Sequence, residues 1–179
     1  MNIPNFITLC RVFLAPFVVW LLIAGQYKLA LLVFCLASAS DALDGWLARV
    51  THTKTDLGTH LDPLADKLLL ISAYTTLGIF KLIPTWLVIT VISRDVLILG
   101  GLLLAWFMAK PVEVRPLFIS KANTLAQIVF LILVLLQLAF ADVPNVLVVA
   151  FTYLVGAFTM ASGIAYLGAW FKHMSRVEG

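Results

Sequence analysis

Residues 41–66 read D-A-L-D-G-W-L-A-R-V-T-H-T-K-T-D-L-G-T-H-L-D-P-L-A-D, and we call this stretch the acidic segment. Four of its aspartates, Asp41, Asp44, Asp62 and Asp66, lie where one long apolar stretch of the chain ends and the next begins. Charged side chains are costly to place in an apolar environment, and those found there usually serve a function. Clustered carboxylates also favour a bound cation, so the acidic segment is the first candidate for a functional site.

The chain as a whole is strongly apolar. Of its 179 residues, 63% are hydrophobic and 12% are charged, and the mean hydropathy is +1.07. A soluble domain is closer to half apolar and a quarter charged. The composition therefore predicts an integral membrane protein. Because one span needs about 20 residues, six spans would take roughly 120 residues and leave only short connections.

The apolar stretches divide the chain into six predicted transmembrane helices, and we expect one all-α domain over residues 1–179. Arg11 interrupts the first stretch and no basic region precedes it, so we interpret it as a span rather than a signal peptide. The predicted spans are Ile7–Ala24, Tyr27–Arg49, Leu61–Phe80, a span from just after Pro84 to Ala109, Ile119–Phe140 and Val146–Phe171.

Basic residues predict the orientation of the spans. Seven lie at the second–third connection, around the fourth–fifth connection or in the tail, against only Lys28 and Lys81 on the opposite side. The seven are Arg49, Lys54, Lys110, Arg115, Lys121, Lys172 and Arg176. The positive-inside rule then places both termini in the cytoplasm. The net charge of +3 is better explained by topology and anionic lipid than by a nucleic-acid partner.

The spacing of the acids predicts a site shared by two helices. Asp41 and Asp44 are i,i+3 neighbours on one helix, and Asp62 and Asp66 are i,i+4 neighbours on the next. The short connection makes the two helices antiparallel, so their acidic faces can converge near the cytoplasmic boundary. Oxygen-rich sites select hard cations such as Mg²⁺ or Mn²⁺, and two such ions can clamp a displacement at phosphorus.

Three further residues suit a phosphate-bearing ligand. Gly45 and Ala48 keep the helix surface low, so a bulky group can approach the backbone. Arg49 can pair with phosphate oxygens. Together with the acids, these residues indicate a site for a metal-bound phosphate or pyrophosphate at the membrane surface.

The motif resembles the signature of the CDP-alcohol phosphotransferase family. It matches at all eight fixed positions, Asp41-x2-Asp44-Gly45-x2-Ala48-Arg49-x8-Gly58-x3-Asp62-x3-Asp66, and the six-span layout is similar over nearly the whole chain. The resemblance implies transfer of a substituted phosphate from a CDP-linked donor to an alcohol, with release of CMP and use of a divalent metal. It also implies a homodimer.

The resemblance further implies roles for single residues. Asp41, Asp44 and Asp62 would hold metal, and Asp66 would complete that site and take the proton from the acceptor hydroxyl. The residues that would contact the CDP moiety of the donor are Pro4, Asn5, Gly45, Arg49, Thr55 and Gly58.

Two later segments bear on the acceptor alcohol. Ile92-Ser93-Arg94-Asp95-Val96 and Phe118-Ile119-Ser120-Lys121-Ala122-Asn123-Thr124 look more like cardiolipin synthases of this family than like phosphatidylglycerophosphate synthases. The latter tend to carry a Lys-x-Lys-Thr pattern where this chain has Asn123 as the third residue. The resemblance thus implies CDP-diacylglycerol as donor and phosphatidylglycerol as acceptor, with glycerol 3-phosphate as the alternative. Arg94, Arg115 and Lys121 are the candidate acceptor contacts.

Other interpretations stay open. Arg94 and Asp95 can form a structural ion pair, Lys121 can anchor a span end, and Arg115 can serve topology alone. Ser120, Asn123 and Gln127 are more often helix-packing or capping groups than ligands. A membrane protein that binds cation or nucleotide without catalysis is the alternative from another class. We expect a bacterial inner membrane, with the site on its cytoplasmic side.

Overall fold

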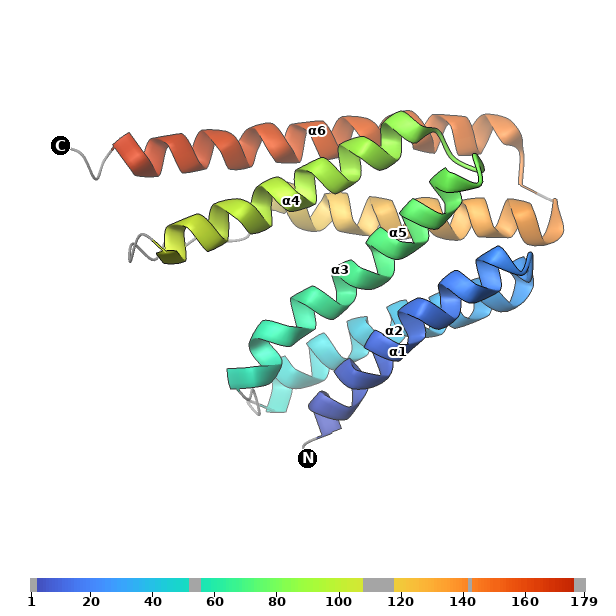
Figure 1. The fold of residues 1–179 in the computed structure, drawn as a ribbon, viewed down its shortest axis with the longest axis horizontal. Helices are drawn as coiled ribbons and strands as arrows, with labels where there is room; N and C mark the ends of the chain where they lie inside the picture. The colour runs from blue at the N-terminus through green and yellow to red at the C-terminus, as the bar shows by residue number, and fades with distance from the viewer. Residues whose placement is uncertain (1–2, 52–55, 108–117, 142, 176–179) are drawn as a thin grey trace. The chain divides into compact units, whose positions relative to one another are not determined.

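The computed structural model describes the backbone of residues 3–51, 56–107, 118–141 and 143–175, and the side chains of residues 13–40, 67–101, 119–141 and 143–168. Within these ranges the chain forms six α-helices and no β-strand, which confirms the all-α prediction (Figure 1). The helices are α1 (Ile3–Ile23), α2 (Tyr27–Thr51), α3 (Asp56–Ile79), α4 (Thr85–Phe107), α5 (Phe118–Phe140) and α6 (Asn145–Ser175).

Each helix coincides with one predicted span, and most ends agree within a few residues. The largest difference is at the start of α3, which begins at Asp56 rather than at Leu61. Because of this earlier start, Pro63 lies beyond the first turn of α3. The mostly polar stretch 56–60 hid this extension, because hydropathy marks the apolar part of a helix and a helix can continue into polar residues.

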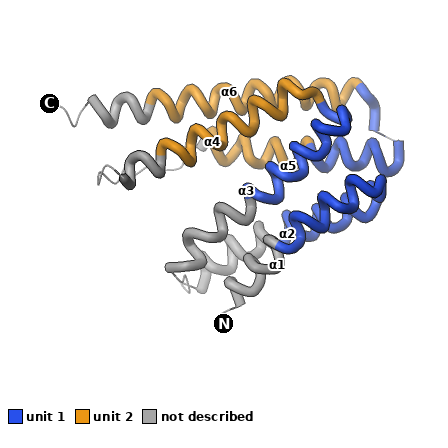
Figure 2. The backbone as a smooth tube through the Cα atoms, viewed as in Figure 1, with its two compact units in different colours: residues 1–83, 131–145 blue, residues 84–130, 146–179 orange. Residues whose placement is uncertain are grey.

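Two compact units make up the described chain (Figure 2). Unit 1 comprises residues 1–83 and 131–145, and unit 2 comprises residues 84–130 and 146–179. Helix α5 contributes its first half to unit 2 and its second half to unit 1. Each unit is described separately below.

In unit 1, α1 packs against both α2 and α3. The buried side chains include Val18 and Leu21 of α1, Phe34 of α2, and Tyr74 and Leu77 of α3. Large apolar side chains of this kind each contribute about 1.5–3 kcal/mol when fully buried. This packing fixes the helices whose continuations carry the acidic segment.

The turn that ends α1 is a Schellman motif. Gly25 has a φ of 70°, its N–H donates to the Leu22 carbonyl at 3.2 Å, and the N–H of Gln26 donates to the Leu21 carbonyl at 2.9 Å. A residue in the left-handed region is needed at this point, and glycine adopts it without steric cost. The motif allows α2 to begin four residues after α1 ends.

The turn that ends α3 repeats this pattern without glycine. Lys81 has a φ of 56°, its N–H donates to the Gly78 carbonyl at 3.0 Å, and the N–H of Leu82 donates to the Leu77 carbonyl at 2.9 Å. A side chain in the left-handed region is sterically unfavourable. This turn therefore holds a small amount of backbone strain.

In unit 2, α4 and α6 run alongside one another (Figure 1). Trp86 of α4 stacks on Tyr153 of α6 with a centroid distance of 5.9 Å. Gly156 makes the close approach possible, because a Cβ atom there would lie 2.8 Å from two ring atoms of Trp86. The buried apolar side chains of the unit include Val91 and Val155.

Many large apolar side chains are exposed on the described helices. Examples are Phe13, Ile79 and Ile164, with exposed fractions of 68%, 71% and 71%. Such surfaces are rare on soluble monomers and are typical of contact with lipid or another apolar partner. Among the described residues, Ile119–Phe140 and Asn145–Gly168 are long and apolar enough to cross a membrane.

Candidate functional site

The acidic segment spans the end of α2 and the beginning of α3. Asp41 and Asp44 lie in α2, and Asp62 and Asp66 lie in α3. Because both stretches are helical, the members of each pair occupy positions on one face of their own helix. Only four residues separate the helices, so the C-terminal end of α2 and the N-terminal end of α3 must lie near one another.

The side chains of the acidic segment are not among those that the structure describes, so their relative positions are not described either. The same holds for most predicted donor contacts: Gly45 and Arg49 fall in α2, Gly58 in α3, and Pro4 and Asn5 in α1. Thr55 and Arg115 lie outside the described backbone as well. The described side chains include no group of three potential metal ligands, but none of the four aspartates is among them. The metal site therefore stays a prediction.

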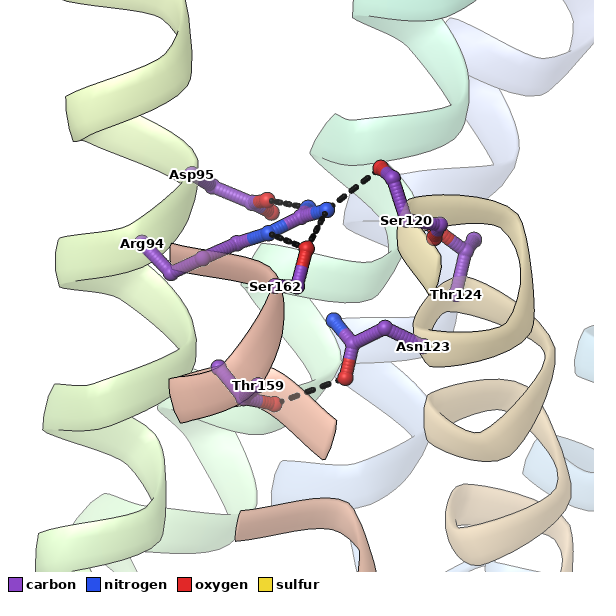
Figure 3. A network of polar contacts seen from close by, with 7 residues as sticks. All are labelled: Arg94, Asp95, Ser120, Asn123, Thr124, Thr159 and Ser162. Atoms are coloured by element: carbon purple, nitrogen blue, oxygen red, sulfur yellow. Dashed lines mark hydrogen bonds and ion pairs between the residues drawn. The ribbon is translucent and has the colours of Figure 1, made fainter. Parts of the chain in front are cut away.

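A second polar cluster is fully described, and it lies in unit 2 (Figure 3). Its centre is the guanidinium of Arg94, a residue of α4 that is only 5% exposed. Nη1 donates to Asp95 Oδ1 at 2.6 Å, and Nη2 donates to Ser120 Oγ of α5 at 2.5 Å. Ser162 Oγ of α6 accepts from Nε at 3.2 Å and from Nη2 at 2.8 Å. The centroid of the Tyr166 ring lies 5.9 Å from Cζ of Arg94.

One helical turn away, a second link joins α5 to α6. Thr159 Oγ1 donates to Asn123 Oδ1 at 2.9 Å, and both residues are completely buried (Figure 3). The Nδ2 group of Asn123 is buried and has no acceptor among the described residues. Thr124 Oγ1 donates to the carbonyl of Ser120 within α5 at 3.2 Å.

A buried ion pair lies at the centre of this cluster. Arg94 and Asp95 bring one positive and one negative charge, and both side chains are almost completely buried. A buried ion pair is tolerated only when hydrogen bonds satisfy its remaining groups, and the hydroxyls of Ser120 and Ser162 do so here. The structural ion pair that the sequence left open is thus present.

Two of the three candidate acceptor contacts, Arg94 and Lys121, lie among the described residues and differ in exposure. Arg94 is buried in the cluster, whereas Lys121, in the first turn of α5, is exposed. The packing contacts expected of Ser120 and Asn123 are confirmed.

Sequence reasoning missed Thr159, Ser162 and Tyr166. They recur at i, i+3 and i+7 along α6, so they share one face of the helix. Small polar residues repeated on one face of an apolar helix often mark a helix–helix contact, and that signal could have identified them.

Comparison with known proteins finds similar sequences for most of this chain. The sequence model of one protein family, described as CDP-alcohol phosphatidyltransferase, matches residues 1–167. A human protein named cardiolipin synthase (CMP-forming) is 35% identical over 144 residues, which are 72% of this chain and 48% of that protein. This chain therefore corresponds to about half the length of that relative.

Two relatives carry a different name, CDP-diacylglycerol–glycerol-3-phosphate 3-phosphatidyltransferase. The chloroplastic protein 1 of Oryza sativa subsp. japonica is 33% identical over 185 residues, covering 93% of this chain and 56% of that protein. The protein of Bacillus subtilis (strain 168) is 33% identical over 178 residues, covering 87% of this chain and 91% of that protein.

Proposed function

Because this chain belongs to the CDP-alcohol phosphatidyltransferase family, we propose that it transfers the phosphatidyl group of CDP-diacylglycerol to phosphatidylglycerol. The products are cardiolipin and CMP. The observation that carries the proposal is the family match over residues 1–167, which includes the acidic segment and the segments around Arg94 and Lys121. The similarity to a cardiolipin synthase (CMP-forming) supports this acceptor.

In this proposal, Asp41, Asp44, Asp62 and Asp66 hold one or two divalent cations, Mg²⁺ or Mn²⁺. Carboxylate oxygens are the ligands that such hard cations prefer, so the donor set fits the metal. The bound ions would polarise the phosphoryl oxygens and neutralise the charge that develops on CMP. Activity that persists in excess EDTA would contradict the metal requirement.

Asp66 acts as the general base. Its carboxylate takes the proton of the free glycerol hydroxyl of phosphatidylglycerol, and the hydroxyl oxygen forms the new bond to the phosphatidyl phosphorus. The bond from that phosphorus to the bridging oxygen of CMP breaks, and CMP leaves with the electron pair. Arg49 can stabilise the charge on the leaving group.

The donor contacts are distributed over three helices and one connection. Gly45 leaves room for the pyrophosphate beside α2, and Arg49 pairs with its oxygens. The remaining contacts proposed for the CDP moiety are Pro4, Asn5, Thr55 and Gly58. Lys121 and Arg115 are the cations proposed to attract the acceptor phosphate.

Glycerol 3-phosphate is the second candidate acceptor, and one observation favours it. The Bacillus subtilis relative, whose name states that acceptor, aligns over 91% of its own length. The two candidates are separated by supplying purified protein with CDP-diacylglycerol and either phosphatidylglycerol or glycerol 3-phosphate. CMP release with glycerol 3-phosphate alone would overturn the preferred acceptor. No CMP from either acceptor would favour the non-catalytic alternative.

The site lies at a membrane surface in this proposal. Six spans with both termini in the cytoplasm would place the connections 52–55 and 108–117 on the cytoplasmic side. We place the protein in a bacterial inner membrane as a homodimer surrounded by membrane lipids. Reaction of introduced cysteines at residues 53 and 113 with an impermeant maleimide, from the cytoplasmic side only, would support this orientation. Reaction from the opposite side would contradict it.

A further inference from the structure

The guanidinium of Arg94 has no free edge for a phosphate. A guanidinium binds a phosphate through a fork of two N–H groups, and its two accessible forks are Nε with Nη2 and Nη1 with Nη2. In this protein the first fork is directed at Ser162 Oγ. The second is divided between Asp95 and Ser120. Four of the five N–H groups therefore have acceptors within the protein.

The charge of Arg94 is also compensated. Asp95 Oδ1 lies 2.6 Å from Nη1, and both side chains are at most 4% exposed. A phosphate that approached this guanidinium would have to displace the buried Asp95 carboxylate from Nη1, and breaking a buried ion pair is costly.

What Arg94 does instead is join three helices. It connects α4 to Ser120 in the first turn of α5 and to Ser162 in α6 (Figure 3). The Asn123–Thr159 link joins α5 to α6 again, three residues after Ser120 in α5 and three residues before Ser162 in α6. Two such links, one turn apart, restrict both rotation and sliding of the beginning of α5. Lys121 is exposed and follows Ser120 directly in α5, so these links also restrict the position of its backbone.

We infer that Arg94 is a positioning residue, which ties the first turn of α5 to α4 and α6 and thereby places Lys121 for the acceptor. This inference rests on the proposed function for the identity of the acceptor. It assigns the direct attraction of the acceptor phosphate to Lys121 and not to Arg94.

The test removes a hydroxyl that cannot touch substrate. Ser162 is completely buried in α6, so Ser162→Ala removes both hydrogen bonds between Arg94 and α6 without altering any proposed substrate contact. The hydrogen bond from Arg94 to Ser120 stays in place. The matched control is Thr152→Val. Thr152 is also buried in α6, but its hydroxyl donates only to the Val148 carbonyl of its own helix, at 2.8 Å.

Two readouts are measured on the purified full-length protein in lipid nanodiscs. The first is the KM for phosphatidylglycerol and for CDP-diacylglycerol. The second is amide hydrogen exchange of residues 119–124. For Ser162→Ala we expect the KM for phosphatidylglycerol to rise roughly threefold to tenfold, with the KM for CDP-diacylglycerol within about twofold of the original value. Exchange in residues 119–124 should become faster, and Thr152→Val should leave both readouts unchanged.

Either an unchanged KM for phosphatidylglycerol or unchanged exchange in Ser162→Ala would overturn the positioning role. A wild-type protein that releases no CMP with phosphatidylglycerol would overturn the proposed function instead. The link between the helices would still be tested in that case, because the exchange measurement does not require catalysis.

Discussion

Arg94 Nη1 lies 2.6 Å from Oδ1 of its immediate neighbour Asp95, and both side chains are buried between helices. Successive residues on a helix normally point in different directions. Here the arginine and aspartate side chains leave α4 on the same side, and the hydroxyls of α5 and α6 hold the guanidinium beside the carboxylate (Figure 3). The pair is therefore part of the packing of unit 2 and not a surface feature.

Loss of the carboxylate should destabilise the protein strongly. In Asp95→Asn, the guanidinium of Arg94 stays buried without a counter-charge. We expect the free energy of unfolding to fall by about 3–5 kcal/mol, the cost of breaking a buried pair on one side. Titration with a denaturing detergent would measure this change in the free energy of unfolding.

The double variant Arg94→Met/Asp95→Asn is the control. It removes both charges, and we expect it to be more stable than Asp95→Asn alone. An Asp95→Asn protein within about 1 kcal/mol of the original would contradict the buried-pair account.

Replacing each of two glycines by alanine should change the stability of the protein in opposite directions. A Cβ at Gly156 would lie 2.8 Å from the indole of Trp86, so Gly156→Ala forces the ring away from Tyr153. We expect a loss of about 1–3 kcal/mol. Gly100 has nothing within 4 Å of such a Cβ, and Gly100→Ala should stabilise α4 by about 0.5–1 kcal/mol. Equal effects in the same unfolding assay would show that α4 and α6 do not pack as described.

The helix-ending turns offer a similar comparison. Gly25→Ala places a side chain at a φ of 70° and should cost about 1–2 kcal/mol, although no neighbour obstructs it. Lys81→Gly relieves the same strain at a φ of 56° and should raise stability by about 0.5–1 kcal/mol. Thermal unfolding of both variants in one detergent would check the pair. Destabilisation by Lys81→Gly would contradict a left-handed Lys81.

The fold was largely predictable from the sequence, because apolar length and turn residues are local signals. Tyr27 begins a helix as predicted, and Phe140 ends one. The beginning of α3 at Asp56 was not predictable from hydropathy, since polar residues can continue a helix beyond its apolar part. The end of α6 at Ser175, four residues beyond the predicted Phe171, has the same explanation.

The partners of Arg94 were less predictable. Ser162 is 68 positions away along the chain, and only the packing of α4 on α6 brings the two together. The sequence offered the ion pair with Asp95 as one of two interpretations, because both residues are adjacent and opposite in charge. The sequence did not predict that Ser120 and Ser162 also accept hydrogen bonds from the guanidinium, since that depends on which face of each helix is buried.

The role of Asp66 is tested by Asp66→Asn, which keeps the size of the side chain and removes its basicity. CMP release should fall at least about 100-fold, because an amide cannot accept the proton of the acceptor hydroxyl. Asp56→Asn is the matched control, since Asp56 begins the same helix but is not one of the eight fixed positions of the motif. Turnover in Asp66→Asn above about a tenth of the original would remove Asp66 as the base.

The product stoichiometry of the purified protein decides whether it transfers a phosphatidyl group from CDP-diacylglycerol to phosphatidylglycerol. Phosphatidylglycerol with an isotopically labelled headgroup glycerol would be supplied together with CDP-diacylglycerol, and the lipids and CMP analysed by mass spectrometry. We expect one labelled cardiolipin for each CMP, with the label retained and no free glycerol. Cardiolipin formed with release of labelled glycerol and without CMP, or no cardiolipin while added glycerol 3-phosphate is consumed, would contradict it.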